Sequence, residues 1–484
     1  MKNPIKTLIG SLAVSALLLV SCSEDFLEVT PSQPTPDVAL SDPEVAPELV
    51  NAIYNKFLNF NMSSFPWIGI TEIASDNANK GSSPGDTGTY QLDLDQYTFT
   101  STSPCFRLLW ENHYQTIGRA NQALLYLPEL DIDEDLKNRL IGEARFLRAL
   151  VYFRLVQMFG AVPVIDKVPD VSSEEDINKA FIRRPVADVY ALIEADLAEA
   201  IDFLPLKSEY EPKDLGRATR GAAQTLMAKV ALYQQNWQTV FDLTQEVINS
   251  GEYSLETNYE DIWKEEFENG VESIFEIQGR GEDPVYGVNN YYVSQGARGQ
   301  GGWGWGFNEP SQDLVNSYEP GDTREDGTII FAGEVLYDGR FVPLTVENPR
   351  YNQKAYVSMN YLSNDKNVRL FRYAEVLLMN AEAANEMNNT AAAQTMLDMV
   401  RLRAGLPGTM AATQEDYRMA IWDERRWELA FEHDRIFDLR RQGRVAEVMI
   451  AHGSAFVEGK HELYPIPEDQ IAQSGGLLEQ NPGY

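Results

Sequence analysis

The segments LMAKVALYQQN, residues 226–236, and LMNAEAANEMN, residues 378–388, decide the fold of this chain. Both have small residues in the middle of a helical pattern, and both reach a turn that contains Asn. Each leads into a second apolar, helix-periodic stretch, at 240–248 and at 391–403, with a glycine after it. The sequence therefore predicts two helical hairpins that lie far apart in the chain.

Two helices joined by a tight turn resemble a tetratricopeptide unit, and residues 147–152 form a weaker third copy. The copies are widely spaced, so long segments must be inserted between the pairs. Further helical periods are found at about 42–58, 108–127, 140–159, 185–201 and 368–443. We expect a mostly α fold of tetratricopeptide-like pairs.

The largest insert runs from about 252 to 366 and shows few helical periods. Gly, Asn, Asp, Tyr and Trp dominate it, and short apolar runs such as 328–331 favour small strands. Loops of this length are usually functional or disordered, and the aromatic content argues against disorder. We predict an irregular, loop-rich insert that carries the ligand face.

Composition removes several classes of function. The chain has 484 residues, 40 Lys plus Arg against 73 Asp plus Glu, and a formal charge of −33, which disfavours nucleic-acid binding. Its two cysteines exclude a disulfide scaffold and a multi-cysteine zinc site. No cofactor is expected, and a structural calcium ion stays open, although the EF-hand spacing is absent.

The N-terminus has the pattern of an exported lipoprotein. Lys2 and Lys6 precede a mostly apolar run at 8–20, which ends just before Cys22. We predict a lipoprotein signal peptide over 1–21 and acylation of the Cys22 thiol; an ordinary signal peptide with an incidental cysteine is the alternative. Cys105 then has no partner, and we expect a buried, inert thiol.

A glycine-rich stretch at 296–306 contains six glycines and two tryptophans. Part of it matches the dinucleotide fingerprint G-x-G-x-x-G, but no strand precedes it and no helix follows, so cofactor binding is not predicted. Rings that alternate with glycine on a loop suit the C–H face of a sugar. We predict ligand contacts from Trp303, Trp305, Tyr291 and Tyr286; the alternative is a small satellite core.

Asp76 and Asn79 lie in a polar loop at 75–89. Their side chains are candidates for hydrogen bonds to ligand hydroxyls. An Asx turn or a weak cation site is the alternative.

The segment 422–440 is dense in both charges and is predicted to be one helix. On such a helix Arg425, Glu428, Glu432 and Arg435 share a stripe, which favours a structural ion-pair network over catalysis. His433 lies in the same helix without a nucleophile motif, so we interpret it as a polar helix residue.

Several motifs together resemble the SusD/RagB family of surface nutrient-binding lipoproteins, over nearly the whole mature chain. They comprise Cys22–Asp25, Gly142–Leu150 leading to Phe159–Pro163, Arg372–Leu378 with Ala381–Ala383, Val400–Gly405, Glu424–Arg425, Glu428–Glu432, Arg435, Phe437–Arg440, Tyr464–Pro467 and Gln480–Tyr484. The resemblance implies a SusD-like α-α superhelix with a loop-rich face. It also implies binding of glycans, or sometimes peptides, without cleavage.

The resemblance further implies a lid on a SusC-like TonB-dependent transporter, and a lipid anchor that holds the protein on the exterior of the outer membrane. We therefore predict a non-catalytic protein that captures oligosaccharide or polysaccharide. After the signal peptide we expect a tether at 22–41, helical regions at 42–251 and 367–484, and the insert between them. A surface glycoside hydrolase, a peptide-binding uptake protein and a helical scaffold stay open as alternatives.

Overall fold

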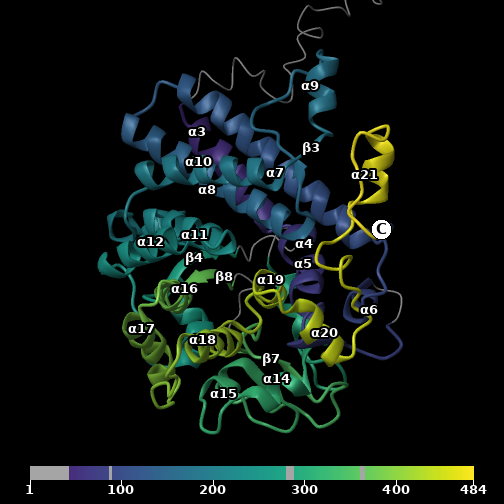
Figure 1. Cartoon of the computed structure of the whole chain (residues 1–484), viewed down its shortest axis with the longest axis vertical. Helices are drawn as coiled ribbons and strands as arrows, with labels where there is room; N and C mark the ends of the chain where they lie inside the picture. Colours follow the sequence, from purple (N-terminus) through teal and green to yellow (C-terminus); the bar gives the residue numbers. More distant parts are fainter. Residues whose placement is uncertain (1–42, 87–89, 280–287, 360–365) are drawn as a thin grey trace, which may run out of the picture.

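The computed structural model describes residues 43–86, 90–279, 288–359 and 366–484. Helices dominate it, and every sheet among these residues is an antiparallel pair of short strands. In Figure 1 the elements lie in stacked layers, with the N-terminal helices at the top and the insert at the bottom. The mostly α fold expected from the sequence is confirmed.

Four N-terminal helices form the upper layer of Figure 1: α3 (Val45–Phe57), α7 (Pro104–Tyr126), α8 (Glu134–Phe159) and α10 (Val186–Phe203). The Asp133 side chain caps α8 by accepting from the Leu136 backbone N–H, and Gly160 ends the helix at a positive φ of 70°. Helix α10 packs along α8. The helical periods at 42–58, 108–127, 140–159 and 185–201 are therefore confirmed.

The two hairpins that decide the fold are α11 (Arg220–Tyr233) with α12 (Trp237–Asn249), and α16 (Tyr373–Glu386) with α17 (Thr390–Arg403). Asn236 and Asn389 cap the second helix of each pair. The alanine rows of α11 and α16 are buried, and α12 packs against α16. The pairs thus stack on one another as tetratricopeptide-like units.

A strand pair frames the insert. Strand β4 (Ser273–Ile277) is buried along its whole length and pairs with β8 (Val368–Arg372), which leads directly into α16. The sequence predicted helix from residue 368, and this is wrong for the first five residues. Val368 and Phe371 are β-formers that are buried here, and pairing with β4 overrides the helical pattern.

The insert packs as several short elements, of which α14, α15 and β7 lie at the bottom of Figure 1. They are α13 (Asn289–Gln295), β5 (Phe307–Pro310), α14 (Gln312–Ser317), α15 (Arg324–Thr328), β6 (Ile329–Phe331) and β7 (Arg350–Asn352). Strand β5 pairs with β1 (Ala78–Gly81), which joins the insert to the N-terminal region. The strand expected near 328–331 is confirmed as β6.

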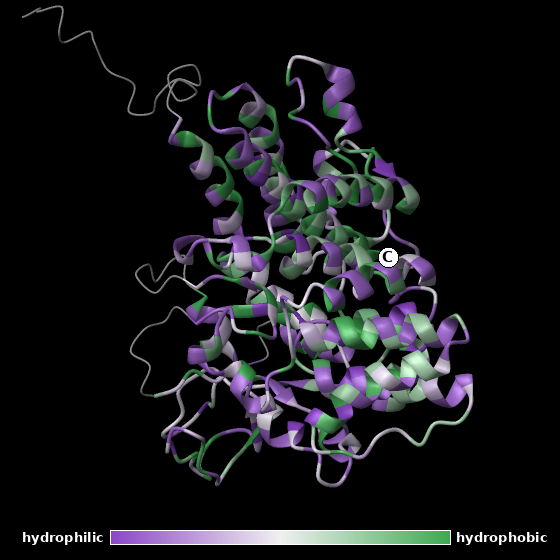
Figure 2. Ribbon diagram, turned by 90° about the vertical axis from the view of Figure 1, so that its left-hand side faces the viewer, coloured by the Kyte–Doolittle hydropathy of each residue, from purple (hydrophilic) through white to green (hydrophobic). Residues whose placement is uncertain are grey.

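The other α-helices and strands of the described residues, with one π-helical turn, are α4 (Phe60–Ser63), α5 (Phe65–Ile68), the π-helical turn (Gly69–Ile73), α6 (Tyr90–Gln96), β2 (Val162–Pro163), α9 (Glu174–Lys179), β3 (Arg183–Arg184), α18 (Gln414–Leu429), α19 (Arg435–Arg441), α20 (Val445–His452) and α21 (Glu468–Gln473). Short 3-10 helices lie at Leu127–Glu129, Lys207–Glu209, Pro212–Asp214, Tyr259–Trp263 and Glu265–Phe267. Figure 2 shows the helices marked in both green and purple, as expected for amphipathic helices in layers. No helix in the described part of the chain is both long and apolar enough to cross a membrane.

The single helix predicted over 422–440 is broken. Helix α18 ends at Leu429, Phe431 and His433 adopt positive φ angles of 64° and 73°, and α19 starts at Arg435. The charged residues therefore do not form the expected stripe along one helix.

The break turns Glu432 toward Arg372, whose Nε lies 2.6 Å from the Glu432 carboxylate. Glu428 also receives a hydrogen bond from Arg372 Nη1, at 2.6 Å. Arg425 instead bonds Asp438. The network is buried, as the structural interpretation requires, but it joins separate elements.

Candidate functional site

The glycine-rich loop after α13 folds back on that helix. The backbone N–H groups of Trp303 and Trp305 donate to the carbonyls of Ala297, at 2.7 Å, and Val293, at 2.8 Å. A Cβ atom on Gly304 would lie 2.4 Å from the Val293 carbonyl oxygen. Only glycine permits this close approach, so the loop holds its two indole rings in fixed positions.

Trp303 points into the insert. Its ring lies 5.4 Å from Tyr356, edge to face, and the Arg340 guanidinium lies 4.7 Å from its centroid. It packs with Ala297, Val342 and other buried residues of a small cluster. The satellite-core alternative therefore describes the position of Trp303.

Trp305 points the other way and is 37% exposed. Its ring lies 6.1 Å from Phe65, edge to face. Phe65 in turn contacts Phe307 at 4.8 Å and Tyr90 at 5.8 Å. We call this group, together with Phe60 stacked on Phe65, the Trp305 platform.

A partly exposed ion pair flanks the platform. Arg298 Nη1 lies 2.6 Å from Asp86 Oδ2, and both side chains are about a third exposed, at 35% and 34%. The same nitrogen donates to the Ser82 hydroxyl at 3.0 Å. A flat ring beside charged and hydroxyl groups presents stacking and hydrogen bonding to one ligand.

The other predicted ligand residues are placed differently. Tyr291 is 6% exposed, and its hydroxyl donates to His433. Asp76 is 2% exposed, and its two carboxylate oxygens accept from Nε and Nη2 of Arg435, each at 2.7 Å. Asn79 lies in β1 opposite Glu309. Tyr286 and Cys22 lie outside the described residues.

His433 lies in a buried hydrogen-bond relay and not on a helix face. Thr71 donates its hydroxyl to the Trp67 carbonyl, so His433 Nδ1–H donates to Thr71 at 2.7 Å, and Nε2 accepts from the Tyr291 hydroxyl at 3.0 Å. Burial, with Arg154 and Lys229 nearby, lowers the pKa of His433 to about 3. The neutral ring anchors α13, the helix that carries the glycine-rich loop.

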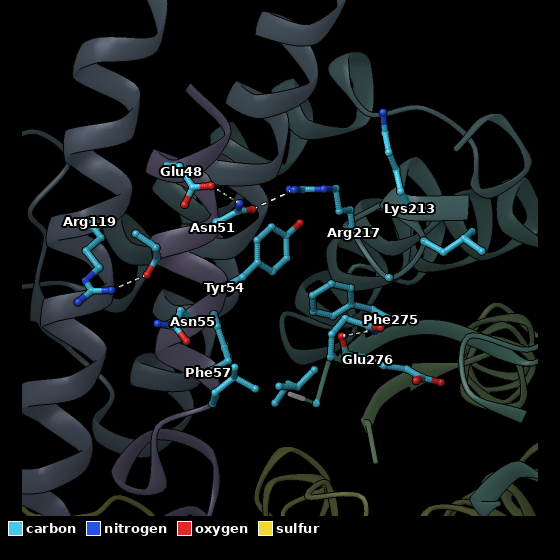
Figure 3. A pocket seen from close by; sticks show the side chains of 17 residues that line it. Glu48, Asn51, Tyr54, Asn55, Phe57, Arg119, Lys213, Arg217, Phe275 and Glu276 are labelled. Atoms are coloured by element: carbon cyan, nitrogen blue, oxygen red, sulfur yellow. Dashed lines mark hydrogen bonds between the residues drawn. The ribbon is translucent and has the colours of Figure 1, made fainter. Parts of the chain in front are cut away.

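A pocket of about 630 Å³ lies between α3, α7 and β4 (Figure 3). Two arginines of its wall are already hydrogen-bonded: Arg217 donates to the Asn51 side chain at 2.9 Å, and Arg119 donates to the Ala52 backbone carbonyl at 2.6 Å. The rings of Phe57 and Phe275 at its wall are 3% and 4% exposed. Neither phenyl ring presents an exposed face comparable to that of the 37% exposed Trp305 indole.

Two further observations concern metals and thiols. Within the described residues, no group of three or more His, Cys, Asp or Glu side chains is arranged to hold a metal ion. Cys105 is free and fully buried, and burial raises the pKa of its thiol. The burial of this thiol, expected from the sequence, is confirmed.

Four residues of this site were not predicted from the sequence: Phe65, Tyr90, Asp86 and Arg298. The segment FNMSSFPW at 60–67 carries an aromatic excess that marks part of the platform. Nothing local relates it to Trp305, because the two segments meet through tertiary contacts, which are the pairing of β1 with β5 and the packing of α13 against α4 and α5.

Comparison with known proteins identifies the family. A profile of the SusD family matches residues 343–484, and a profile described as starch-binding, associating with the outer membrane, matches residues 25–232. SusD-like protein P2 of Formosa agariphila is 30% identical over 437 residues, which cover 83% of this chain and 85% of the relative.

Solved structures agree. A SusD-like protein from Bacteroides fragilis NCTC 9343 superposes with a TM-score of 0.80 at 26% identity, covering 93% of this chain and 99% of the other. A laminarin-binding SusD-like protein superposes with a TM-score of 0.77 at 29% identity, covering 91% and 99%. With the 30% identical relative aligned over most of both chains, these matches show that the chain belongs to the SusD family.

Proposed function

We propose that this protein captures oligosaccharide or polysaccharide at the cell surface, on the Trp305 platform, without cleaving it. The observation that carries the proposal is the 37% exposed indole of Trp305 beside the Arg298–Asp86 pair. The ring stacks on the apolar face of a sugar, and the ion pair and Ser82 bond its hydroxyls. Such a site recognises a sugar by the shape of its ring and by the positions of its hydroxyl groups.

The family supports a glycan as the ligand. One matching profile carries a starch-binding description, and one structural relative binds laminarin. Starch and laminarin are therefore the first two glycans to test. The acidic surface of the chain, with a net charge of −33, disfavours polyanionic glycans.

Binding without hydrolysis agrees with the state of the flanking acid. A glycosidase needs a general acid and a second carboxylate across the bond. Asp86 Oδ2 accepts hydrogen bonds from Arg298 Nη1 at 2.6 Å and from the Ser82 hydroxyl at 2.8 Å, and no second carboxylate is paired with it across the platform in the described residues. The hydrolase alternative would need its acids elsewhere.

The test uses soluble residues 23–484 and native gels that contain starch, laminarin or no glycan. The matched variants are Trp305→Ala and Trp303→Ala, two residues apart in the same loop. We expect wild-type retardation by at least one glycan. Trp305→Ala should weaken binding about tenfold or more, while folded Trp303→Ala keeps more of it.

Each gel mixture is also assayed for new reducing ends. New ends would contradict the proposal and favour a hydrolase. Retardation that Trp305→Ala retains in full would move the site away from the platform. No retardation by any glycan in a broad panel would favour the peptide-binding or scaffold alternative.

Delivery and anchoring are the finer parts of the proposal. We infer that acyl chains on Cys22 hold the protein in the outer membrane, facing the exterior, and that it passes glycan to a SusC-like TonB-dependent transporter. Cys22→Ala should release the protein or leave it as precursor. Membrane-bound, acylated Cys22→Ala protein would contradict the anchor, and failure to co-purify with a SusC-like transporter would contradict the delivery step.

A further inference from the structure

The insert contains a short β-hairpin at 334–342. Val335 and Phe341 form a bridge across it, and the chain turns through Asp338 and Gly339. Gly339 has a φ of 89°, the left-handed conformation that glycine adopts readily in a short hairpin loop. Because successive residues of a strand point to opposite sides, this hairpin has an inner and an outer face.

The inner face belongs to the core of the insert. Leu336 is 7% exposed and Val342 is fully buried, and both pack in the small cluster that includes Trp303. The Asp338 carboxylate accepts from the Tyr356 hydroxyl at 2.6 Å. The fold itself therefore covers this face.

The outer face carries three large side chains that are exposed although they are apolar or aromatic. Val335 is 66% exposed, Tyr337 is 36% exposed and Phe341 is 54% exposed. Val335 and Phe341 lie directly opposite each other, so their side chains are neighbours on one face. The solvated face of an antiparallel pair is usually polar, and exposed apolar side chains that gather on one face mark an interaction surface.

The Tyr337 ring is held in one orientation by its neighbours. It lies edge to face with Tyr356, at 5.6 Å between ring centroids, and the Lys264 ammonium lies 4.9 Å from its centroid. A ring that is already fixed loses little conformational entropy when a ligand stacks on it.

A pocket of about 680 Å³ lies beside this face, and Val335 and Tyr337 line it. Its wall also contains the Thr257 hydroxyl and the Asn258 amide, which can donate and accept, and the Asp326 carboxylate, which accepts. Such a mixed wall suits the hydroxyls of a neutral sugar, which also donate and accept. Protein–protein interfaces are instead depleted of charged residues at their core, so the pocket favours a sugar over a protein as the occupant.

The hairpin is joined to the loop that carries the Trp305 platform. The Glu347 N–H donates to the Arg298 carbonyl at 2.8 Å. Six residues separate Phe341 from Glu347, so the Cα atoms of these two residues are at most about 22 Å apart. The outer face of the hairpin therefore lies within reach of one polysaccharide chain that is bound at the platform.

We propose that the outer face of this hairpin, together with the pocket beside it, is a second contact surface for a neutral glycan. The rings of Tyr337 and Phe341 stack on sugar rings, and the polar groups of the pocket bond the hydroxyls. This inference rests on the proposed glycan-capture function and extends it. A polysaccharide that is held at two surfaces dissociates only when both release it.

The test is a set of native gels with graded concentrations of laminarin or starch, run with residues 23–484. The hairpin variant Tyr337→Ala/Phe341→Ala should bind the glycan that retards wild type about three- to tenfold more weakly. Phe341→Trp, which keeps a ring, should bind at least as tightly as wild type. The hairpin variant combined with Trp305→Ala should bind more weakly than either variant alone.

Leu344→Ala is the matched control, because Leu344 is 78% exposed in the same insert and carries no ring. It should bind like wild type, and thermal unfolding checks that every variant is folded. If the double variant unfolds, Phe341→Ala alone replaces it. A folded hairpin variant that binds as wild type does overturns the proposal, in favour of a protein partner for this face. Equal losses in Leu344→Ala and the hairpin variant also overturn it, because ring stacking would then not be responsible.

The two glycan-binding surfaces can fail separately in this experiment. Loss of binding in Trp305→Ala with none in the hairpin variant overturns the hairpin surface and leaves the platform standing. Loss in the hairpin variant with none in Trp305→Ala supports the hairpin surface and overturns the platform. If neither laminarin nor starch retards wild type, and no glycan of the broad panel does, both are overturned.

Discussion

The buried network around Arg372 and the Trp305 platform both combine charges with aromatic rings, yet their charges are satisfied differently. In the network, Arg372 is 1% exposed and bonds Glu272, Glu428 and Glu432. At the platform, the side chains of Arg298 and Asp86 are about a third exposed, and they lie beside the 37% exposed indole of Trp305. The charged groups of the buried network bond only within the fold, whereas Arg298, Asp86 and the indole at the platform keep exposed surface that a ligand can contact.

The comparison separates residues that the sequence presents alike. Aromatic rings lie against Arg372 too, since its guanidinium is 5.8 Å from the Tyr259 ring and 5.5 Å from Trp263. Both rings are buried, so neither exposes a face on which a sugar could stack. Exposure of the ring, and not its charged neighbour, distinguishes a binding surface from a core.

The largest effect should come from Arg372→Met. The substitution leaves three carboxylates without their common cation, and breaking a buried ion pair costs about 3–5 kcal/mol of unfolding free energy. Denaturant unfolding measures the loss. Arg184→Met is the control, because Arg184 pairs with Asp188 at the surface, where the two side chains are 56% and 42% exposed. Losing this exposed pair should cost about 0.5 kcal/mol or less of unfolding free energy. Equal losses in the two variants would contradict the structural role of the network.

Trp303→Ala should have the next largest effect. The ring packs against Tyr356 and Arg340 inside the insert, and removing it leaves a cavity that costs about 2–3 kcal/mol. Thermal unfolding of Trp303→Ala beside Trp305→Ala tests the opposite orientation of the two rings. Equal destabilisation by both substitutions would show that the rings are equally buried.

Glu72→Gln tests the buried relay under the insert. Glu72 is 1% exposed, it accepts from the His433 backbone N–H, and its Oε2 has no partner among the described residues. Burial raises the pKa of Glu72 to about 8. The hydrogen bond from the His433 N–H lowers this pKa in part, and the nearby Asp434 carboxylate raises it further. The folded protein therefore retains a proton that the unfolded chain releases near pH 4.5.

The contribution of protonated Glu72 to the unfolding free energy is fully present below pH 4.5. It is lost as the pH rises toward 8, by up to about 1.4 kcal/mol per pH unit. Glu72→Gln should remove this pH dependence. The unfolding free energy of the variant should therefore rise relative to that of wild type as the pH rises. Unfolding curves at pH 5, 6, 7 and 8 measure it, with Asp131→Asn as an exposed control. Parallel pH profiles for wild type and Glu72→Gln would contradict the raised pKa.

The hairpins were predictable because their information is local. The alanine rows, the Asn caps and the following glycines lie within each pair, and α11, α12, α16 and α17 form as expected. Strand β8 and the break after Leu429 were not predictable in this way. They depend on pairing with β4 and on the bond between Arg372 and Glu432, which lie 60 residues apart.

The candidate site shows the same limit more sharply. Trp303 and Trp305 stand in one GWGWG motif with nearly identical neighbours, so local sequence gives no reason for their different directions. Trp303 meets Tyr356 later in the chain, and Trp305 meets Phe65 far earlier. Asp76 likewise has a loop-like sequence, and becomes buried because Arg435, 359 residues away, bonds it.

The smallest effect on stability, and the finest test of the comparison, should come from Arg298→Gln. A pair that is a third exposed contributes about 1 kcal/mol or less to unfolding, so this variant should unfold like wild type within that margin. Its affinity for the platform's glycan should still fall about three- to tenfold, because a charge-assisted donor beside the indole is lost. Arg298→Lys, which retains the charge without the planar fork, should recover part of the affinity. Calorimetric titration with the glycan that retards wild type in the native gels measures the affinity of both variants. Unchanged affinity in Arg298→Gln would mean that Arg298 does not contribute to binding and that the ring stacking does.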